Sequence, residues 1–319
     1  MNALITGGAG FIGSHLAERL LSGGHRVYVL DDLSTGRLQN ILHLLKEERF
    51  HFTEGSILDE ALVESLVRRA EIIYHLAAVV GVKHILEDPS RCIQVNVRGT
   101  ENLLEAAHRH GRKVLLASSS EVYGKSTALP LREEDDRLSG PTNVCRWAYA
   151  ESKALDEHLA FGYHKKGLPV VIVRYFNVYG PRLDPEGYGS VIARFIGQAL
   201  RGEPLTVYSD GAQTRCFTYV EDTVQGTILA AMIKEAEGHV FNIGTDREIS
   251  IRELAEKIKE LTGSASPIFH LSYEQAYGED FEETRRRVPD VSKAEKVLGF
   301  RARVGLEEGL RRTIAWFKK

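Results

Sequence analysis

Short apolar runs alternate with amphipathic stretches over the first 180 residues, and this alternation constrains the fold more than any other feature. The amphipathic stretches have apolar residues at helical spacing, often end in glycine, and cover residues 14–24, 60–70, 97–111 and 152–167. The apolar runs between them are NALIT (2–6), RVYVL (26–30), EIIYHLAA (71–78), KVLLASSS (113–120) and LPVVIVRYF (168–176). Strands that alternate with helices pair in parallel, so the pattern predicts an α/β fold with a doubly wound parallel sheet, that is, one with helices on both faces.

The pattern changes after the segment FNVYGPR (176–182). From there on the elements are shorter and glycine is more frequent, with helical patterns over 250–263 and 305–319. We therefore expect residues 1–180 to form one domain and residues 181–319 to form mainly a smaller α/β lobe, with some segments returning to the first domain. Such a lobe would lie over the carboxyl edge of the strands, where ligands of open α/β sheets bind.

Composition disfavours several classes of protein. Hydrophobic residues make up 43% of the chain, so a substantial core is expected. The formal net charge is −3 and no basic block stands out, which argues against a nucleic-acid partner. No apolar run reaches membrane length and the start resembles no signal peptide, so we expect a cytoplasmic protein that does not bind membranes. Cys92, Cys145 and Cys216 show no paired ligand spacing, and we expect no metal site.

A glycine-rich turn follows the first predicted strand and opens the first predicted helix. Within GGAGFIG (7–13), Gly7, Gly10 and Gly13 fit the spacing G-x-x-G-x-x-G, and Gly8 gives G-x-G-x-x-G. Small residues let the backbone approach a pyrophosphate, which the N-terminus of a helix favours. The motif in this context predicts a dinucleotide site.

The identity of the dinucleotide is predicted from the end of the second strand. Asp31 follows RVYVL, where a carboxylate would hold the adenosine ribose hydroxyls and repel a ribose phosphate. The nearest downstream arginine is Arg37. We therefore predict NAD rather than NADP.

Tyr149 and Lys153 lie four residues apart in RWAYAESK (146–153), which has the pattern of the first turn of a helix, so they share a face. Moving a tyrosine pKa from about 10 to near 7 requires roughly 4 kcal/mol of phenolate stabilisation. A lysine ammonium one turn away and a bound nicotinamide would supply it. A serine of SSSEVYG (118–124), at the same sheet edge, would hold the same substrate oxygen. The competing interpretation is a chance pairing on a helix surface, which the glycine motif and the serines make less favourable.

The segments TGGAGFIG, HLAA, SSSEVYG, YAESK and RYFNVYGPR, in this order, resemble the extended short-chain dehydrogenase/reductase family that acts on nucleotide sugars. The resemblance covers essentially the whole chain. It implies an NAD-binding Rossmann domain and a C-terminal lobe for a nucleoside diphosphate sugar such as a UDP-sugar. It also implies a homodimer, because the helices near 97–110 and 150–166 match those that pair across a dimer in the family.

The resemblance assigns roles to individual residues. Tyr149 would take the proton of the sugar C4 hydroxyl, Lys153 would bind the nicotinamide ribose and lower the tyrosine pKa, and Ser119 would be the catalytic serine. Where many relatives have an aspartate that meets the adenine amino group, this chain has Ser56. The implied cofactor contacts are Gly7, Gly10, Phe11, Ile12, Gly13, Asp31, Asp32, Ser56, Ile57, Leu76, Ala77, Ala78, Tyr149 and Lys153.

On the sugar side, the resemblance places Arg215 near the phosphates or sugar and makes Arg287 a second, diphosphate-binding arginine. Guanidinium groups pair well with phosphate oxygens, which makes this assignment chemically reasonable. The implied substrate contacts are Lys83, Ser119, Asn177, Arg182, Val191, Tyr208, Arg215 and Arg287.

All branches of the family begin by oxidising C4, and the residues Ser119, Ser120 and Glu121 bear on the later steps of the reaction. A 4,6-dehydratase typically has Thr-Asp-Glu there; the missing aspartate disfavours dehydration. A uronate decarboxylase has Ser-Glu at the last two positions, as here, and RCFTYV and GPRLD also resemble UDP-xylose synthases. Relatives with helices of the RWAYAESKALDE type include 4-epimerases.

We expect a UDP-glucose/UDP-glucuronate 4-epimerase, with a UDP-glucuronate decarboxylase as the alternative and an NDP-sugar 4,6-dehydratase less favoured. A non-enzymatic Rossmann protein that senses NAD predicts a broken Tyr-x-x-x-Lys pattern, whereas the pattern here is intact. The expected catalytic residues are Ser119, Ser120, Glu121, Tyr149 and Lys153.

Overall fold

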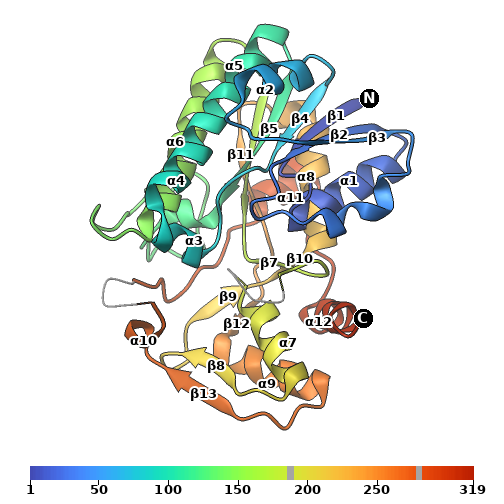
Figure 1. Cartoon of the computed structure of the whole chain (residues 1–319). Coiled ribbons are helices and arrows are strands. Elements are labelled where there is room, and N and C mark those ends of the chain that lie inside the picture. The colour runs from blue at the N-terminus through green and yellow to red at the C-terminus, as the bar shows by residue number, and fades with distance from the viewer. Residues whose placement is uncertain (185–189, 278–281) are drawn as a thin grey trace.

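A seven-stranded, entirely parallel sheet forms the upper part of the molecule (Figure 1). The computed structural model describes residues 1–184, 190–277 and 282–319. The strand order is β11-β6-β5-β4-β1-β2-β3, which confirms the predicted doubly wound, Rossmann-type sheet. The strands are β1 (Asn2–Thr6), β2 (Arg26–Asp31), β3 (Phe50–Glu54), β4 (Ile72–His75), β5 (Lys113–Ser119), β6 (Val170–Tyr175) and β11 (Val240–Ile243).

Helices cover both faces of this sheet because successive strand side chains point to opposite sides. In β1, Leu4 packs with one buried cluster and Ile5 with the other. One face is covered by α2 (Glu60–Val67), α5 (Gly99–His110) and α6 (Trp147–Lys165), the other by α1 (Phe11–Ser22), α8 (Val220–Met232) and α11 (Ser292–Leu298). Between β4 and α5 the chain forms α3 (Val82–Glu87), α4 (Pro89–Ile93) and a π-helical turn (Gln94–Arg98).

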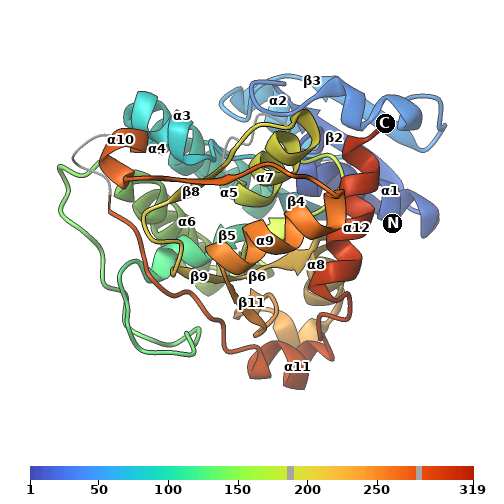
Figure 2. The same cartoon turned by 90° about the horizontal axis from the view of Figure 1, so that it is seen from below.

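A smaller set of elements lies across the carboxyl ends of the strands (Figure 2). It contains a parallel pair, β8 (Leu205–Tyr208) with β13 (Ile268–Leu271), and an antiparallel pair, β9 (Thr214–Cys216) with β12 (Glu248–Ser250). A short parallel pair, β7 (Val178–Tyr179) with β10 (Thr218–Tyr219), lies between this part and the large sheet. The helices of this part are α7 (Val191–Arg201), α9 (Ile251–Thr262), α10 (Tyr273–Tyr277) and α12 (Leu306–Phe317).

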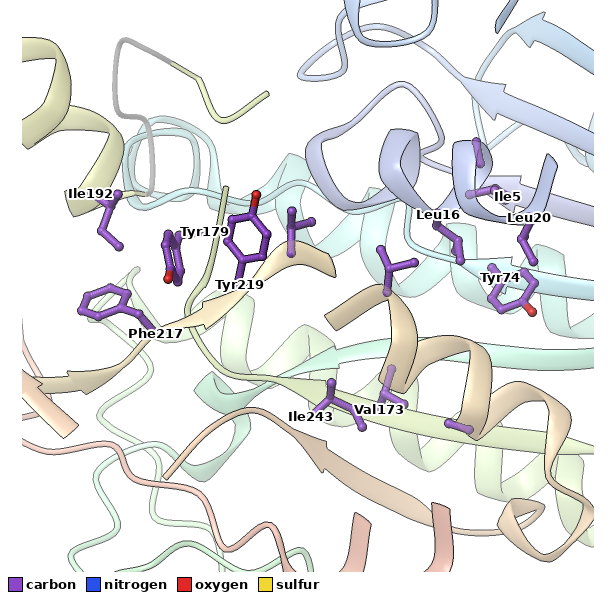
Figure 3. Packing of buried hydrophobic residues seen from close by; sticks show 14 of the residues in the cluster. Ile5, Leu16, Leu20, Tyr74, Val173, Tyr179, Ile192, Phe217, Tyr219 and Ile243 are labelled. Carbon is purple, nitrogen blue, oxygen red and sulfur yellow. The ribbon is translucent and has the colours of Figure 1, made fainter. Parts of the chain in front are cut away.

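The chain after residue 180 does not stay in the smaller part. It returns to the large sheet as α8, β11 and α11, and β11 pairs in parallel with β6 through Val240–Ile172 to Ile243–Tyr175. One hydrophobic cluster runs through both parts, from Ile5 in β1 and Leu16 in α1 to Phe217 and Ile192 in the smaller part (Figure 3). The two parts therefore share one continuous core.

Two elements, β3 and α7, were not predicted from the sequence. The edge strand β3, FHFTE, has only Phe50 fully buried, so it lacks the continuous apolar run of a central strand. Helix α7 begins after Ser190, whose side chain accepts the N–H of Ala193. In the described ranges, no helix is long and apolar enough to cross a membrane.

Candidate active site

A cleft of about 720 Å³ lies at the carboxyl ends of β1, β2, β4, β5 and β6. Its lining comes from the glycine turn, from the segment after β2, from the HLAA segment and from the start of α6, together with Asn177, Arg182 and Arg287. Parallel strands bring these chain-distant segments to one edge, so the fold itself assembles the site.

The glycine turn leaves no room for side chains at one end of the cleft. Gly7 has a φ of 73°, and a Cβ there would lie 2.8 Å from the backbone nitrogen of Ala77. A Cβ on Gly13 would clash with the carbonyl oxygen of Gly7. Gly10 precedes α1 and provides no side-chain cap, which leaves the first N–H groups of that helix for a ligand. This backbone fits a dinucleotide pyrophosphate.

Asp31 is buried at the end of β2 and is fixed by the backbone. Its Oδ2 accepts the N–H of Ala9 and its Oδ1 accepts the N–H of Leu33, both at 2.9 Å. Burial raises the pKa of this carboxyl. The guanidinium of Arg37 lies 2.5 Å from Asp184 and is already matched by that carboxylate. The end of the cleft therefore offers an acceptor for ribose hydroxyls, which fits NAD.

Most of the predicted cofactor residues line this cleft, and Ser56 does not. Its hydroxyl accepts the N–H of Leu58 within its own turn, while the neighbouring Gly55 and Ile57 line the cleft. The lining includes Gly7, Gly10, Phe11, Ile12, Gly13, Asp31, Asp32, Ile57, Leu76, Ala77, Ala78, Tyr149 and Lys153.

Ser119, Tyr149 and Lys153 all line the cleft. Ser119 ends β5 and its hydroxyl accepts the N–H of Glu121 at 3.2 Å. Tyr149 lies in the first turn of α6, as the sequence predicts, and Lys153 follows one turn later. Burial raises the pKa of the Tyr149 phenol, and a hydrogen bond with the Ser119 side chain opposes that rise. The three residues have the placement required to hold and move a proton at one substrate oxygen.

The ammonium of Lys153 is paired with a buried carboxylate. This ammonium lies 3.1 Å from Oδ2 of Asp156, and both side chains are buried. The expectation that Lys153 lowers the tyrosine pKa assumed an uncompensated ammonium. In the structure a carboxylate balances that charge, and the Asp156 charge raises the pKa of Tyr149.

A group of five charged side chains, which we call the arginine cluster, lies beside the serines. Glu121 accepts from Arg146 at 2.7 Å and from Arg287 at 2.6 Å. Glu283 lies 2.6 Å from Arg215 and 3.5 Å from Arg146. The two guanidinium groups outweigh burial and hold the pKa of Glu121 well below its usual range, so this carboxyl is ionised.

The predicted substrate residues divide into two sets. Asn177, Arg182 and Arg287 line the cleft together with Ser119. Four others do not, namely Lys83, Val191, Tyr208 and Arg215. Lys83 is half-exposed on α3 with its ammonium 3.8 Å from Glu87, Val191 opens α7, Tyr208 lies under the guanidinium of Arg194, and Arg215 is buried behind Glu283.

Sequence reasoning missed Arg146, Glu283 and Asp156. Arg146 lines the cleft and is 6% exposed, so it is part of the site. The sequence position of Arg146 could have indicated this role, because Arg146 immediately precedes the helix that bears Tyr149. Glu283 had no local signal, because its role depends on two arginines far away in sequence.

Among the residues that the structure describes, no group of three His, Cys, Asp or Glu side chains forms a metal site.

Comparison with known proteins finds nucleotide-sugar enzymes in each case. A family model described as GDP-mannose 4,6 dehydratase matches residues 4–313. The UDP-N-acetyl-alpha-D-glucosaminuronate decarboxylase of Bacillus cytotoxicus is 48% identical, with 99% of this chain and 97% of that protein covered. UDP-glucuronic acid decarboxylase 1 of Xenopus tropicalis is 40% identical over 99% of this chain and 72% of its own length.

A solved structure also matches over its whole length. It is a UDP-glucuronic acid 4-epimerase from Bacillus cereus in complex with UDP-glucuronic acid and NAD. The TM-score is 0.89 and the identity 33%, and the match covers 100% of this chain and 99% of the other.

These relatives correct one prediction. A 4-epimerase was the expected activity, yet the curated relatives at 48% and 40% identity are decarboxylases, so that expectation is wrong. The motifs that favoured it, such as the helix pattern around Tyr149, are shared by branches that carry out different reactions. The chain belongs to the extended short-chain dehydrogenase/reductase family of nucleotide-sugar enzymes, matched by the GDP-mannose 4,6 dehydratase model.

Proposed function

We propose that this protein is an NAD-dependent decarboxylase of a UDP-linked hexuronic acid. The observation that carries the proposal is the arginine cluster, in which three guanidinium groups face two carboxylates beside Ser119 and Ser120. Arg287 of this cluster is buried, and its Nη2 has no hydrogen-bond partner among the described residues, which is unfavourable in a buried setting. Both kinds of UDP-sugar carry the diphosphate, but at the sugar end a neutral hexose brings no anion, whereas a hexuronate brings its C6 carboxylate. The identity to two decarboxylases supports the same choice.

Arg287 is the group we expect to meet that carboxylate. Its Nη1 is held by Glu121, while its buried Nη2 has no hydrogen-bond partner among the described atoms. A buried guanidinium N–H without an acceptor is costly, and a substrate carboxylate would satisfy it. We therefore assign Arg287 to the sugar end of the site and not to the diphosphate. Arg182, whose buried Nη1 also lacks a partner among those atoms, and Asn177 are the proposed diphosphate contacts.

The cofactor residues would hold NAD through the glycine turn and Asp31. When bound, NAD supplies the acceptor and later the donor of the C4 hydride. The chain's own part in the first step is proton removal: Tyr149 takes the C4 hydroxyl proton, and the Ser119 hydroxyl holds the same oxygen.

Decarboxylation then results from the position of the new ketone. The C6 carboxylate is β to the C4 carbonyl, so cleavage of the C5–C6 bond releases carbon dioxide and moves the electron pair onto the C4 oxygen. The hydroxyls of Tyr149 and Ser119 stabilise that enolate by hydrogen bonds. A proton from water would then add at C5, and Tyr149 would return its proton to the C4 oxygen when the C4 ketone is reduced again. The net change is one hexuronate and one proton giving one pentose and carbon dioxide.

Glu121 serves as an anchor in this scheme. With its pKa held far below neutrality it has no proton to donate, so it is not the acid that protonates C5. It instead positions the guanidinium groups of Arg146 and Arg287, one on each carboxylate oxygen. Ser120 is buried at the same edge and lines the cleft.

The direct test is to incubate the purified protein with UDP-glucuronate, UDP-N-acetylglucosaminuronate and UDP-glucose. Mass spectrometry should show loss of carbon dioxide from one or both uronates and no such loss from UDP-glucose. The Tyr149→Phe protein is the matched control and should leave the uronates unchanged. Unchanged mass with a new C4 configuration, or loss of water, would refute the proposal.

We also propose that the protein forms a homodimer through α5 and α6. Leu155 on α6 and Ile93 on the adjoining α4 are large apolar residues that remain exposed in the single chain. A light-scattering mass near 35.6 kDa, that of one chain, at micromolar concentration would contradict this.

A further inference from the structure

The Lys153 ammonium has a carboxylate partner that the expected tyrosine–lysine chemistry does not use. Asp156 follows Lys153 by three residues on α6, and Lys153 Nζ donates to its Oδ2 at 3.1 Å. The exposed fraction is 2% for Lys153 and 0% for Asp156. Water therefore screens this pair poorly, and the charge of each residue acts strongly on its surroundings.

Two other titratable side chains nearby, His75 and Glu157, cannot balance the charge of the Lys153 ammonium in place of Asp156. His75 on β4 lies between Thr6 and Thr100, with Nδ1 2.7 Å from one hydroxyl and Nε2 2.9 Å from the other. Burial, with a smaller effect of Lys153, lowers the pKa of His75 to about 3, so this ring is neutral. The next carboxylate on the helix, Glu157, is already matched by Arg174.

We propose that Asp156 is a positioning residue that balances the Lys153 ammonium, so that Tyr149 can return a proton to the substrate as well as remove one. The proposal rests on the proposed function, in which the same phenol acts as a base at the start and as an acid at the end. A phenolate stabilised by an unopposed ammonium would remove the first proton readily and return it slowly. A group that does both works best when its proton affinity is intermediate.

The other groups around Tyr149 also change its pKa, but none of them balances the charge of Lys153. Burial is the largest influence and raises its pKa, the Ser119 hydrogen bond lowers it, and Glu121, Cys92 and Asp156 raise it. Arg146 and Arg287 face the same site, but both are paired with Glu121. Asp156 is thus the carboxylate that acts on the tyrosine through its lysine.

The test is to titrate Tyr149 directly in Asp156→Asn. Asparagine keeps an oxygen that can accept from Lys153 and removes the negative charge. The purified, NAD-loaded protein without sugar is titrated by ultraviolet absorbance, and the Tyr149→Phe spectrum in each background is subtracted. We expect the phenol of Tyr149 to ionise about one pH unit lower in Asp156→Asn than in the parent. The acid limb of the kcat/KM profile should move down by the same amount.

Glu151→Gln is the matched control, because Glu151 lies on the same helix, the substitution removes the same charge, and the side chain is 44% exposed beside Arg137. It should move the titration by less than about 0.3 pH unit, since exposed charges are screened. Asp156→Glu should restore most of the parent titration. If Asp156→Asn does not fold, Asp156→Ser provides the same loss of charge in a smaller side chain.

An unshifted Tyr149 titration in a folded Asp156→Asn protein, with only its thermal stability changed, would assign Asp156 a structural role and overturn the proposal. The titration uses no sugar. Failure of the protein to release carbon dioxide from a uronate would therefore count against the proposed function and leave this measurement standing.

Discussion

This molecule holds two buried groups of charged side chains, and they differ in how completely their hydrogen-bond donors are satisfied. Arg174 on β6 and Glu157 on α6 form a two-bonded pair at 2.9 and 2.7 Å, and Arg174 also donates to the carbonyl of Glu133. Ser118 donates to the same glutamate, and the guanidinium lies over the Tyr123 ring. Every nitrogen of Arg174 that can donate therefore has an acceptor or an aromatic face.

The arginine cluster at the cleft is different. Its three guanidinium groups share two carboxylates, and Arg287 Nη2 has no acceptor among the described residues. The Arg174–Glu157 pair, which we call the closed pair, has all its donors satisfied and fixes a helix to a strand. The arginine cluster keeps a donor that an anion bound in the cleft could satisfy. Both groups are buried and charged, so these properties do not distinguish a structural group from a binding group. The two groups differ in whether a hydrogen-bond donor is left unsatisfied.

The largest effect should come from the reacting group at the cleft. Tyr149→Phe removes the hydroxyl and keeps the ring, so kcat on the true substrate should fall by roughly 10²–10⁴-fold. The free energy of unfolding should change by less than about 1 kcal/mol. Steady-state kinetics and urea denaturation measure the two. A variant that retains a tenth of the parent rate would show that the chemistry lies elsewhere.

The closed pair should show the opposite behaviour. Arg174→Met leaves the buried Glu157 without its partner and should lower the free energy of unfolding by about 3–5 kcal/mol. If urea denaturation showed this variant to be as stable as the parent, the closed pair would not be a structural pair. Replacing both residues, with Glu157→Leu added, should recover part of the loss.

Arg287→Met removes one guanidinium group from the arginine cluster and tests what the Nη2 of Arg287 binds. We expect kcat/KM for the uronate to fall by about 30–100-fold, equivalent to about 2–3 kcal/mol, because a charge-assisted hydrogen bond is lost. Affinity for UDP alone, measured by calorimetry, should be unchanged. Weaker binding of UDP would instead place Arg287 at the diphosphate, as the sequence resemblance implied.

The smallest effect is expected at a third pair, Arg37 with Asp184, which is neither buried nor part of the chemistry. Arg37→Ala should lower stability by less than about 1 kcal/mol, the usual value for an exposed ion pair. It should also leave the preference for NAD over NADP unchanged, since Asp31 and not Arg37 sets that preference. Thermal shifts with each dinucleotide provide the measurement, and a gain of NADP binding would contradict the assignment.

The sequence predicted those parts of the molecule that depend on local pattern. The central strands are continuous apolar runs, and the glycine turn and the Tyr149 helix carry their signals within a few residues. The edge strand at Phe50 and the partnership of Glu283 with Arg215 were missed for one reason: their stability comes from contacts made by distant segments. Asp156 was missed because its pattern is that of any helical carboxylate, and only its burial reveals its role.

The return of the chain to the large sheet as β11 has a consequence for any attempt to divide the protein. A fragment ending near residue 180 would contain the dinucleotide motif and the tyrosine–lysine pair but would lose the strand that pairs with β6. Val171 and Val173 would then lie on an open, apolar sheet edge, which invites strand addition between molecules. We expect such a fragment to aggregate, so the nucleotide-binding half of this chain is not a portable module that could be joined to another protein.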